Sequence, residues 1–471
     1  MKILLVAPCP LNEQRPNTMD IPQLTLSLIA GMTPEEHEVE ICEEVYGEVI
    51  NFDGDYDVIG ITLMTQTCLR GYEVANEFRL RDKIVVFGGI HATSLPYEAI
   101  KYGDAVVIGE AEGGLWERVL NDIKSKKLRP FYKNDTLPDL QQPSYPRRDL
   151  IKCVSGRFSV VPIETTRGCP YNCDFCSVSR FFGTKQRHKP MKNIIADAES
   201  CEQNYLFFLD DNISGDKKFA KELFENLIPL KKGWVGQASV NIAGDKELLT
   251  LAKKSGCRAL LIGFESMTDK GLNLYRKSLK SMQENVDAVK RLQDYDIMTM
   301  SSLIFGIDND TLDVFDAGLE FIERSKTAFY QSCIATPYPG TPVYERLKME
   351  GRILTDDWRN YDATKVIIKP TNFSPETLLE ESNRLQKRIY SNASIMKRAW
   401  PNMMCGLDST LFYLSLNKGY QKLFNQKKSL GVMKNKEGDT VDFDISKYVK
   451  PVKEVMPEIT NEIQSWGFTQ L

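Results

Sequence analysis

Short apolar runs alternate with amphipathic segments through most of this chain, and this alternation limits the folds that it can adopt. Five runs in the first 125 residues have the length and composition of buried strands: 2–7, 38–43, 58–63, 83–87 and 104–108. Helix-like segments, such as 23–30 and 71–80, lie between them. Strands that alternate with helices form parallel sheets covered by helices. We therefore predict an α/β fold that begins with a doubly wound parallel sheet.

A second alternation begins at residue 160. Its strand candidates are residues 160–165, 205–210, 234–239, 258–263, 298–305 and 329–336. Six strand–helix units predict a partial (β/α)6 barrel, because a full barrel of this type needs eight. Functional residues in such barrels gather where the loops leave the carboxyl ends of the strands. The loop after the first strand of the second alternation is therefore the first candidate for a functional site.

Proline and polar residues separate the two alternations. Residues 126–158 start with a lysine-rich run and contain several prolines, which is typical of a stiff linker. Near the other end, Ser374-Pro375-Glu376 has the pattern of a helix start. The predicted parts are a first domain at 1–125, a linker at 126–158, a barrel at 159–370 and a mostly helical, substrate-shaping region at 371–471.

Composition narrows the possible partners and surroundings. The net charge is −4, with 42% hydrophobic and 26% charged residues, so no basic surface for nucleic acid is expected. No apolar run is long enough to span a bilayer. The chain opens with a strand-like run in place of a signal peptide. We therefore expect a cytoplasmic protein, in which most of the eleven cysteines are reduced thiols.

Three cysteines stand on the loop after the first strand of the predicted barrel. Cys169, Cys173 and Cys176 have the spacing C-x3-C-x2-C. Three thiolates on one short loop can hold three irons of a [4Fe–4S] cluster, which leaves the fourth iron open to an outside ligand. The alternatives are buried thiols without metal, or a zinc site, for which His188 is the one nearby fourth ligand. The spacing and the preceding strand favour the cluster.

The segment from Thr165 to Ser177 resembles the signature of the radical S-adenosylmethionine (SAM) enzymes. That resemblance implies that the amino and carboxylate groups of SAM chelate the open iron. It also implies that one electron from the cluster cleaves SAM to a 5′-deoxyadenosyl radical. In the family, an aromatic residue just before the third cysteine packs near the adenine, and Phe175 holds that position.

Residues at the other strand ends of the barrel resemble the family's SAM contacts in the same order. An acidic and amide cluster follows the second strand, polar residues suited to ribose end the third, a Gly-x-Glu motif ends the fourth, and an apolar segment ends the fifth. The implied SAM contacts are Phe175, Asp210, Asp211, Asn212, Gln237, Ser239, Glu265 and Ile304. Taken alone, each has an ordinary explanation as a turn or a helix cap.

The first domain resembles the cobalamin-binding domain that precedes many radical SAM domains. The resemblance rests on V-F-G-G-I-H-A-T at 86–93 and V-I-G-E-A-E at 107–112. It implies a cobalamin site at the carboxyl ends of the strands, where parallel sheets bind ligands. The implied contacts are Thr62, Thr65, Gly88, Gly89, His91, Gly109 and Glu110. Because the Asp-x-His-x-x-Gly motif is absent, cobalamin would lack a histidine lower ligand; a domain that has lost the cofactor is the alternative.

Together these resemblances imply a cobalamin-dependent radical SAM enzyme that methylates an unactivated carbon of a peptide, tetrapyrrole, lipid or natural product. Its partners would be such a substrate and an electron donor such as flavodoxin or ferredoxin. A radical SAM cyclase or rearrangement enzyme is an alternative. A methylthiotransferase is another, and it would use Cys9, Cys42 and Cys68 for a second cluster. A non-enzymatic cobalamin or iron–sulfur sensor is the third.

Overall fold

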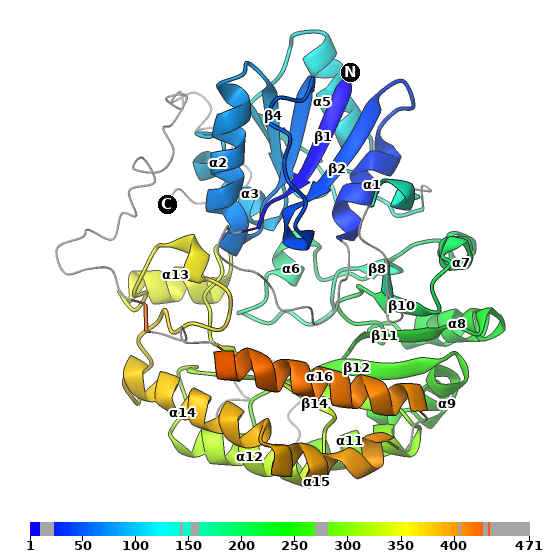
Figure 1. Ribbon diagram of the computed structural model, residues 1–471, viewed down its shortest axis with the longest axis vertical. Coiled ribbons are helices and arrows are strands. Elements are labelled where there is room, and N and C mark those ends of the chain that lie inside the picture. The colour runs from blue at the N-terminus through cyan, green and yellow to red at the C-terminus, as the bar shows by residue number, and fades with distance from the viewer. Residues whose placement is uncertain are drawn as a thin grey trace.

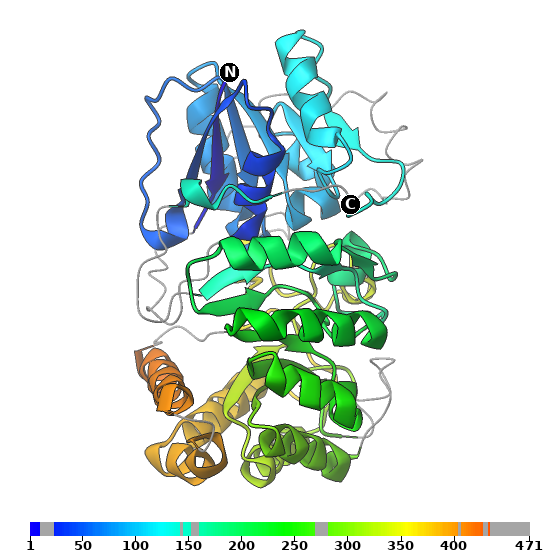
Figure 2. The same cartoon turned by 90° about the vertical axis from the view of Figure 1, so that its right-hand side faces the viewer.

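The computed structural model describes residues 1–9, 23–141, 145–151, 160–268, 281–403, 407–426 and 432–433. Two α/β bodies are stacked along the long axis of the molecule, with the N-terminal body at the top of Figure 1 and helices α14 to α16 beside the lower body. The view turned by 90° shows the same succession of layers (Figure 2). The predicted α/β fold class is confirmed.

The N-terminal sheet has six parallel strands in the order β2-β1-β3-β4-β5-β6. They are β1 (Lys2–Ala7), β2 (Glu38–Glu43), β3 (Val58–Thr62), β4 (Ile84–Gly88), β5 (Ala105–Ile108) and β6 (Phe131–Lys133). The first five match the strands predicted from the sequence. The sixth lies within 126–158, the predicted linker, and pairs with β5 at the edge of the sheet. Its three residues are too few to show a strand period.

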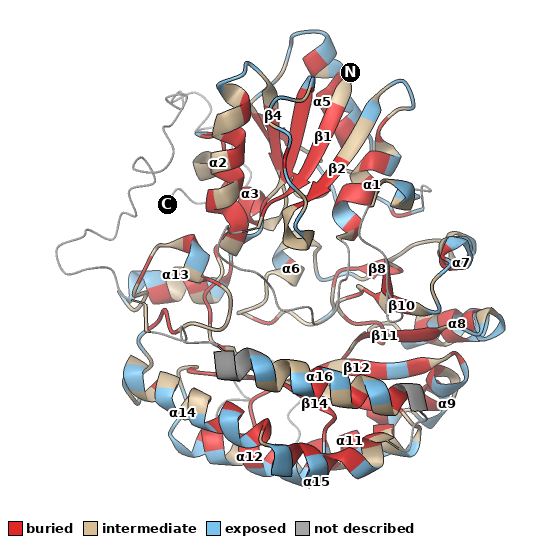
Figure 3. Cartoon of the chain, in the orientation of Figure 1, coloured by how far each residue is buried: buried red, intermediate tan, exposed pale blue. Residues whose placement is uncertain are grey.

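Helices cover both faces of this sheet, as the double winding requires. They are α1 (Leu24–Met32), α2 (Cys68–Arg79), α3 (Ile90–Ser94), α4 (Pro96–Ala99) and α5 (Leu115–Lys124). Successive side chains of β1 point to opposite faces. Ile3 and Leu5 therefore join a core with α1 and α5, whereas Leu4 and Val6 join a core with α2. Burial of both faces explains why these strands read as continuous apolar runs; Figure 3 shows them as mostly buried.

The second sheet also has six parallel strands, in the order β14-β13-β12-β11-β10-β7. They are β7 (Val160–Ile163), β10 (Tyr205–Phe208), β11 (Gly233–Ala238), β12 (Cys257–Glu265), β13 (Met298–Phe305) and β14 (Phe329–Ile334). The outer helices are α7 (Met191–Ser200), α8 (Lys217–Leu227), α9 (Lys246–Lys254), α11 (Met282–Asp294) and α12 (Asp313–Ser325). In the described chain β7 and β14 do not pair with each other, so the barrel is open as predicted.

Residues 335–369, which we call the strap, leave the barrel and pack against the first domain. The strap contains α13 (Pro342–Met349) and the short helix η6 (Trp358–Asn360). Its side chains Tyr344, Leu347 and Trp358 belong to the apolar core on the α2 face of the N-terminal sheet. The predicted division places the strap in the barrel domain (159–370), because nothing in its local pattern shows which core its aromatic residues complete.

The described part of the C-terminal region is helical. It comprises α14 (Pro375–Ile389), α15 (Asn392–Met403) and α16 (Leu407–Gln426). Ser374 caps α14 as predicted, since its hydroxyl accepts a hydrogen bond from the Thr377 N–H (3.1 Å). Residues 404–406, 427–431 and 434–471 of the predicted region lie outside the described part. Among the helices that the structure describes, none is both long and apolar enough to cross a membrane.

Candidate active site between the sheet and the barrel

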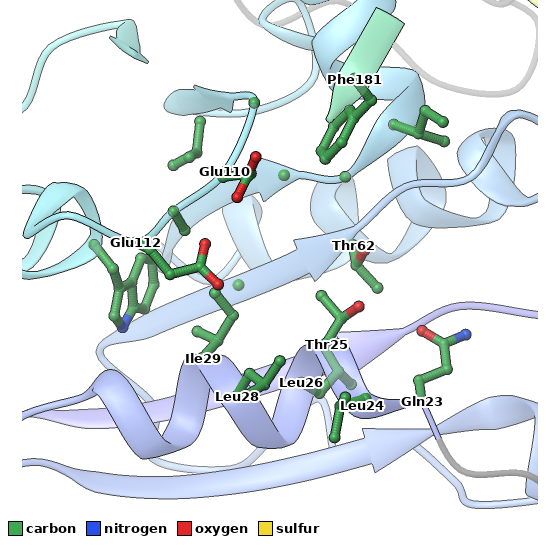
Figure 4. A pocket seen from close by; sticks show the side chains of 18 of the residues that line it. Gln23, Leu24, Thr25, Leu26, Leu28, Ile29, Thr62, Glu110, Glu112 and Phe181 are labelled. Atoms are coloured by element: carbon green, nitrogen blue, oxygen red, sulfur yellow. The ribbon is translucent and has the colours of Figure 1, made fainter. Parts of the chain in front are cut away.

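A cavity of about 350 Å³ lies where the carboxyl ends of the N-terminal strands meet the start of the barrel. Side chains of α1 line one side of it, and Thr62, Glu110 and Glu112 lie around the same space (Figure 4). The barrel contributes Glu164, Thr166, Arg167, Leu209 and Asp211. The cavity is therefore shared by the two domains.

Two glycines at the end of β4 leave the backbone open to the cavity. Gly89 has φ +94°, and a Cβ there would lie 2.8 Å from the Leu63 carbonyl oxygen, so the position is restricted to glycine. A Cβ at Gly88 would meet nothing within 4 Å. The same is true of Gly109 at the end of β5. A large flat ligand can therefore approach the backbone closely at this edge, and the residues present fit a corrin ring.

Five of the seven predicted cobalamin contacts line this cavity: Thr62, Gly88, Gly89, Gly109 and Glu110. Thr65 and His91 do not. Thr65 is buried at the start of the short helix η2 (Thr65–Thr67).

His91 is fully buried on α3, where its ring lies beside the rings of Tyr72 and Trp358. Its Nε2 lies 3.1 Å from the Glu98 carboxylate. The Trp358 indole N–H of the strap donates to both oxygens of the same carboxylate, at 3.1 Å each. His91 therefore helps to join the strap to the first domain. Of the three histidines in the chain, all within the described residues, none lines the cavity.

The cysteine loop follows β7 and is held by a small antiparallel hairpin, β8 (Thr166–Arg167) with β9 (Arg187–His188). Gly168 has φ +89°, and a Cβ there would lie 2.6 Å from the Lys185 carbonyl oxygen, so only glycine fits this turn. The Cys169 N–H donates to the Gly183 carbonyl (3.3 Å). The conformation of the loop that carries the three cysteines is thus fixed by backbone contacts.

The zinc alternative is not supported by the position of His188. Its ring stacks on Phe219 of α8 (4.2 Å between centroids), and its Nε2 lies 3.5 Å from Asp216. Elsewhere in the described residues, ligand atoms of Cys68, His91 and Glu98 lie within 4.8 Å of one another. Neither Cys9 nor Cys42 belongs to this group.

Asp210 and Asn212 brace the site and do not line the cavity. The buried Asp210 carboxylate accepts hydrogen bonds from the Thr165 N–H (3.2 Å) and from the hydroxyls of Thr165 and Thr166 (2.6 Å each). The Asn212 side-chain oxygen accepts from the Ser239 N–H (3.1 Å). These bonds tie the ends of β10 and β11 to the start of the cysteine loop.

Asp211, between them, lines the cavity. Burial, together with the charges of Asp210 and Glu164, raises the pKa of Asp211 to about 7. Asp211 also contributes to the raised pKa of the Cys176 thiol, after burial as the main cause. Its carboxyl group is therefore close to the cysteine loop and sensitive to a nearby cation.

Three other predicted SAM contacts share the inner face of the barrel. Gln237 on β11 and Ile304 on β13 are half-buried at alternate positions whose neighbours face the outer helices. Glu265 ends β12 at φ +65°, next to a shift in the pairing register. A positive φ in a residue other than glycine strains the backbone, and such strain is typical of a functional site. Ser239 follows β11, and Phe175 is half-buried on the cysteine loop.

The sequence did not reveal a buried ionic network beside the cavity. Arg167, two residues before Cys169, pairs with Glu110 (2.7 Å) and Glu112 (2.6 Å) of the first domain and with Glu164 (2.7 Å) of the barrel. Lys189 also pairs with Glu164 (2.8 Å). Burial would raise the pKa of Glu164, but the charges of Arg167 and Lys189 outweigh it and lower the pKa to about 2. Glu110 lies 57 residues from Arg167 in the chain, so no local pattern indicates that the two domains pair here.

Comparison with known proteins agrees with both halves of this arrangement. Residues 18–117 match the B12 binding domain, and residues 163–322 match the Radical SAM superfamily. The chain is 31% identical over 387 residues to bacteriochlorophyllide d C-12(1)-methyltransferase of Chlorobaculum tepidum, covering 80% of this chain and 84% of that protein. It is 29% identical to the C-8(2)-methyltransferase of the same organism, with 80% and 88% covered.

A solved structure of similar fold is the radical SAM methyltransferase TsrM of Kitasatospora setae. It aligns with a TM-score of 0.66 over 90% of this chain and 99% of its own, at 14% identity. The cobalamin-dependent radical enzyme OxsB aligns with a TM-score of 0.67 over 90% and 72%, at 15% identity. The predicted order of sheet, barrel and C-terminal helices is therefore confirmed. This chain belongs to the methyltransferases of the radical SAM superfamily that carry a B12-binding domain.

Proposed function

We propose that this enzyme methylates an unactivated carbon of a small organic molecule, and that a tetrapyrrole is the first substrate class to test. The observation that supports methylation is the single cavity into which both the cobalamin-type sheet edge and the start of the barrel project. The tetrapyrrole proposal comes from the two bacteriochlorophyllide methyltransferases, over four-fifths of whose length this chain aligns.

The residues present fit both cofactors. Cys169, Cys173 and Cys176 would hold the cluster, and the open glycine edge at Gly88 and Gly109 would receive cobalamin. When bound, the cluster with SAM supplies a 5′-deoxyadenosyl radical, and cobalamin supplies the methyl group. The protein's part is to bind both beside one cavity and to keep water out of it.

We assign the SAM contacts to residues that face this region. Asp211 would accept from the SAM amine, because its carboxyl lines the cavity near the cysteine loop and a cation would restore its charge. Gln237, Glu265 and Ile304 would line the remainder of the site along the inner face of the barrel. Asp210 and Asn212 would position the loop, because their hydrogen bonds are made to the protein.

The cluster would receive its electron from a low-potential donor such as flavodoxin or ferredoxin, which places the reaction in a reducing compartment. We propose that residues 1–125 together with β6 form the cobalamin-binding unit, and that the strap belongs structurally to it. A radical cyclase remains the second candidate reaction, because an anaerobic magnesium-protoporphyrin IX monomethyl ester cyclase of Cereibacter sphaeroides is 25% identical over half of this chain.

The test is anaerobic reconstitution with iron, sulfide and hydroxocobalamin, followed by measurement of corrin, iron and 5′-deoxyadenosine. We expect one corrin and four irons per chain, as one cluster and one cobalamin would give. Cys173→Ala should remove the cluster and SAM cleavage and leave the N-terminal sheet folded. Bacteriochlorophyllide d is the first substrate to supply, and a product heavier by one CH2 group identifies methylation. Ring closure without added carbon would identify the cyclase, and absence of bound corrin would refute both cobalamin-dependent reactions.

A further inference from the structure

The ionic network beside the cavity joins the two domains at the cysteine loop. Glu110 and Glu112 follow β5 of the first domain, whereas Arg167 and Glu164 flank the start of the loop in the barrel. Arg187 pairs with Glu110 from the other strand of the small hairpin, opposite Arg167. With Lys189, the network contains three cations and three carboxylates, so its formal charge is zero.

These ion pairs are buried. The Arg167 side chain is 7% exposed and that of Glu110 is 1% exposed. Exposed ion pairs contribute little to the position of a side chain, because water and salt screen them. Buried pairs are different: loss of one partner leaves an uncompensated charge in a medium of low dielectric. The network therefore has one strongly preferred arrangement, in which Arg167 lies against the end of β5.

The position of Arg167 is transmitted to the cysteines through a stiff connection. Only Gly168 separates it from Cys169, and that glycine sits in a turn closed by the carbonyls of Lys185 and Gly183. The Arg167 guanidinium also lies over the Phe182 ring (5.7 Å to the centroid), and Phe182 lines the cavity. A shift of Arg167 relative to β5 would therefore move the first cysteine and the cavity wall together.

We propose that Arg167, held by Glu110 and Glu112, is a positioning residue that fixes the cysteine loop at a set distance from the cobalamin-binding edge of the sheet. It touches no reacting atom in this proposal. Its function is to keep the SAM site and the cobalamin site in register, so that both serve one cavity. Reactions between two bound groups lose rate steeply when their separation changes by as little as 1 Å. The proposal rests on the proposed function, because it concerns two cofactors assigned there.

The variants are Arg167→Met, which removes the charge but keeps much of the volume, and Glu112→Gln, a milder change in case the first fails to fold. Arg148→Met is the matched control. Arg148 also makes an ion pair that is partly buried, with Asp197 (2.9 Å), and donates to the Pro162 carbonyl (2.8 Å), but it does not line the cavity. All proteins are reconstituted with the cluster and hydroxocobalamin as full chains.

Two measurements need no substrate. The first is the dipolar coupling between cob(II)alamin and the reduced cluster in pulsed EPR, which reports their separation. The wild type should give one narrow distance, and Arg167→Met a broad distribution. The second is methylcobalamin formation from SAM after reduction, which should fall about 10- to 100-fold in Arg167→Met with iron and corrin content retained. Glu112→Gln should change both in the same direction by less, and Arg148→Met should match the wild type.

Hydrogen exchange of residues 165–177 in the cluster-loaded protein separates failure of this proposal from failure of the proposed function. If no variant, including the wild type, retains corrin, cobalamin dependence is refuted, but exchange in Arg167→Met should still be about tenfold faster or more than in Arg148→Met. Equal exchange in those two variants would overturn the positioning role. A wild-type distance distribution in a corrin-loaded Arg167→Met would overturn it as well.

Discussion

Gly88 and Gly89 are adjacent at the end of β4, and alanine at each should impair the protein for a different reason. Gly89 has φ +94° and ψ −179°. Residues other than glycine rarely adopt this backbone region, and doing so costs them about 1–3 kcal/mol. An added Cβ would also lie 2.8 Å from the Leu63 carbonyl and 2.9 Å from the Leu63 nitrogen, both of them backbone atoms. The backbone of Leu63 is fixed by two hydrogen bonds: its N–H donates to the Gly88 carbonyl (2.8 Å), and its carbonyl accepts from the His91 N–H (3.0 Å).

Strain and overlap together predict that Gly89→Ala loses about 3 kcal/mol or more of unfolding free energy. For a domain of roughly 150 residues, a loss of about 3 kcal/mol corresponds to a decrease of about 6–12 °C in Tm. Gly88→Ala should stay within about 1 kcal/mol of the wild type, because nothing lies within 4 Å of its Cβ position. The new methyl group would instead project where cobalamin is proposed to bind.

The assay is thermal unfolding of the apoprotein, followed by anaerobic loading with hydroxocobalamin and measurement of retained corrin. Gly88→Ala should unfold like the wild type and retain less corrin. Gly89→Ala should lose stability before any cofactor is added. A Gly89→Ala protein with wild-type Tm would contradict the glycine-only backbone. A Gly88→Ala protein that retains corrin normally would show that cobalamin does not approach the end of β4.

Three further predictions concern other parts of the chain. Asp210→Ala should lower the iron retained per chain, because the carboxylate that holds the Thr165 and Thr166 hydroxyls (2.6 Å each) is lost; iron analysis checks this. Arg398→Met should destabilise the protein by roughly 3 kcal/mol, measured by denaturant unfolding, since the buried guanidinium donates to the Thr327, Ala328 and Ile389 carbonyls. Burial raises the pKa of Asp310 to about 7, so its contribution to stability is lost as the pH rises from about 4 to about 7, and Asp310→Asn should flatten that dependence in apoprotein unfolding curves.

The strands and the cysteine loop could be predicted from sequence because their determinants are local. The predicted strand 298–305 matches β13 at both ends, since an apolar run bounded by turn signals is visible without any partner. The pair Gly88-Gly89 after an apolar run also indicates a tight turn, because glycine adopts a positive φ without steric cost.

Features that depend on distant contacts could not be predicted. Arg167 and Glu110 are 57 residues apart in the chain, so their pairing follows only from the docking of two domains. His91 is predicted to contact cobalamin but does not line the cavity, since its ring is held by Glu98 and packs near Trp358, which is 260 residues beyond Glu98. The sequence shows which of these residues are charged or aromatic, but it does not show which residue each of them contacts.

The strap has a consequence for how such a protein can be divided. Tyr344, Leu347, Trp358 and Tyr361 complete an apolar core of the first domain, although they follow the last barrel strand in sequence. A fragment cut at residue 125 would thus expose a large aromatic surface and be prone to aggregate. If the first domain were exchanged between two relatives, the strap would have to come from the same relative as that domain. Because the strap follows the barrel in sequence but packs in the core of the first domain, the two domains are expected to be inherited together.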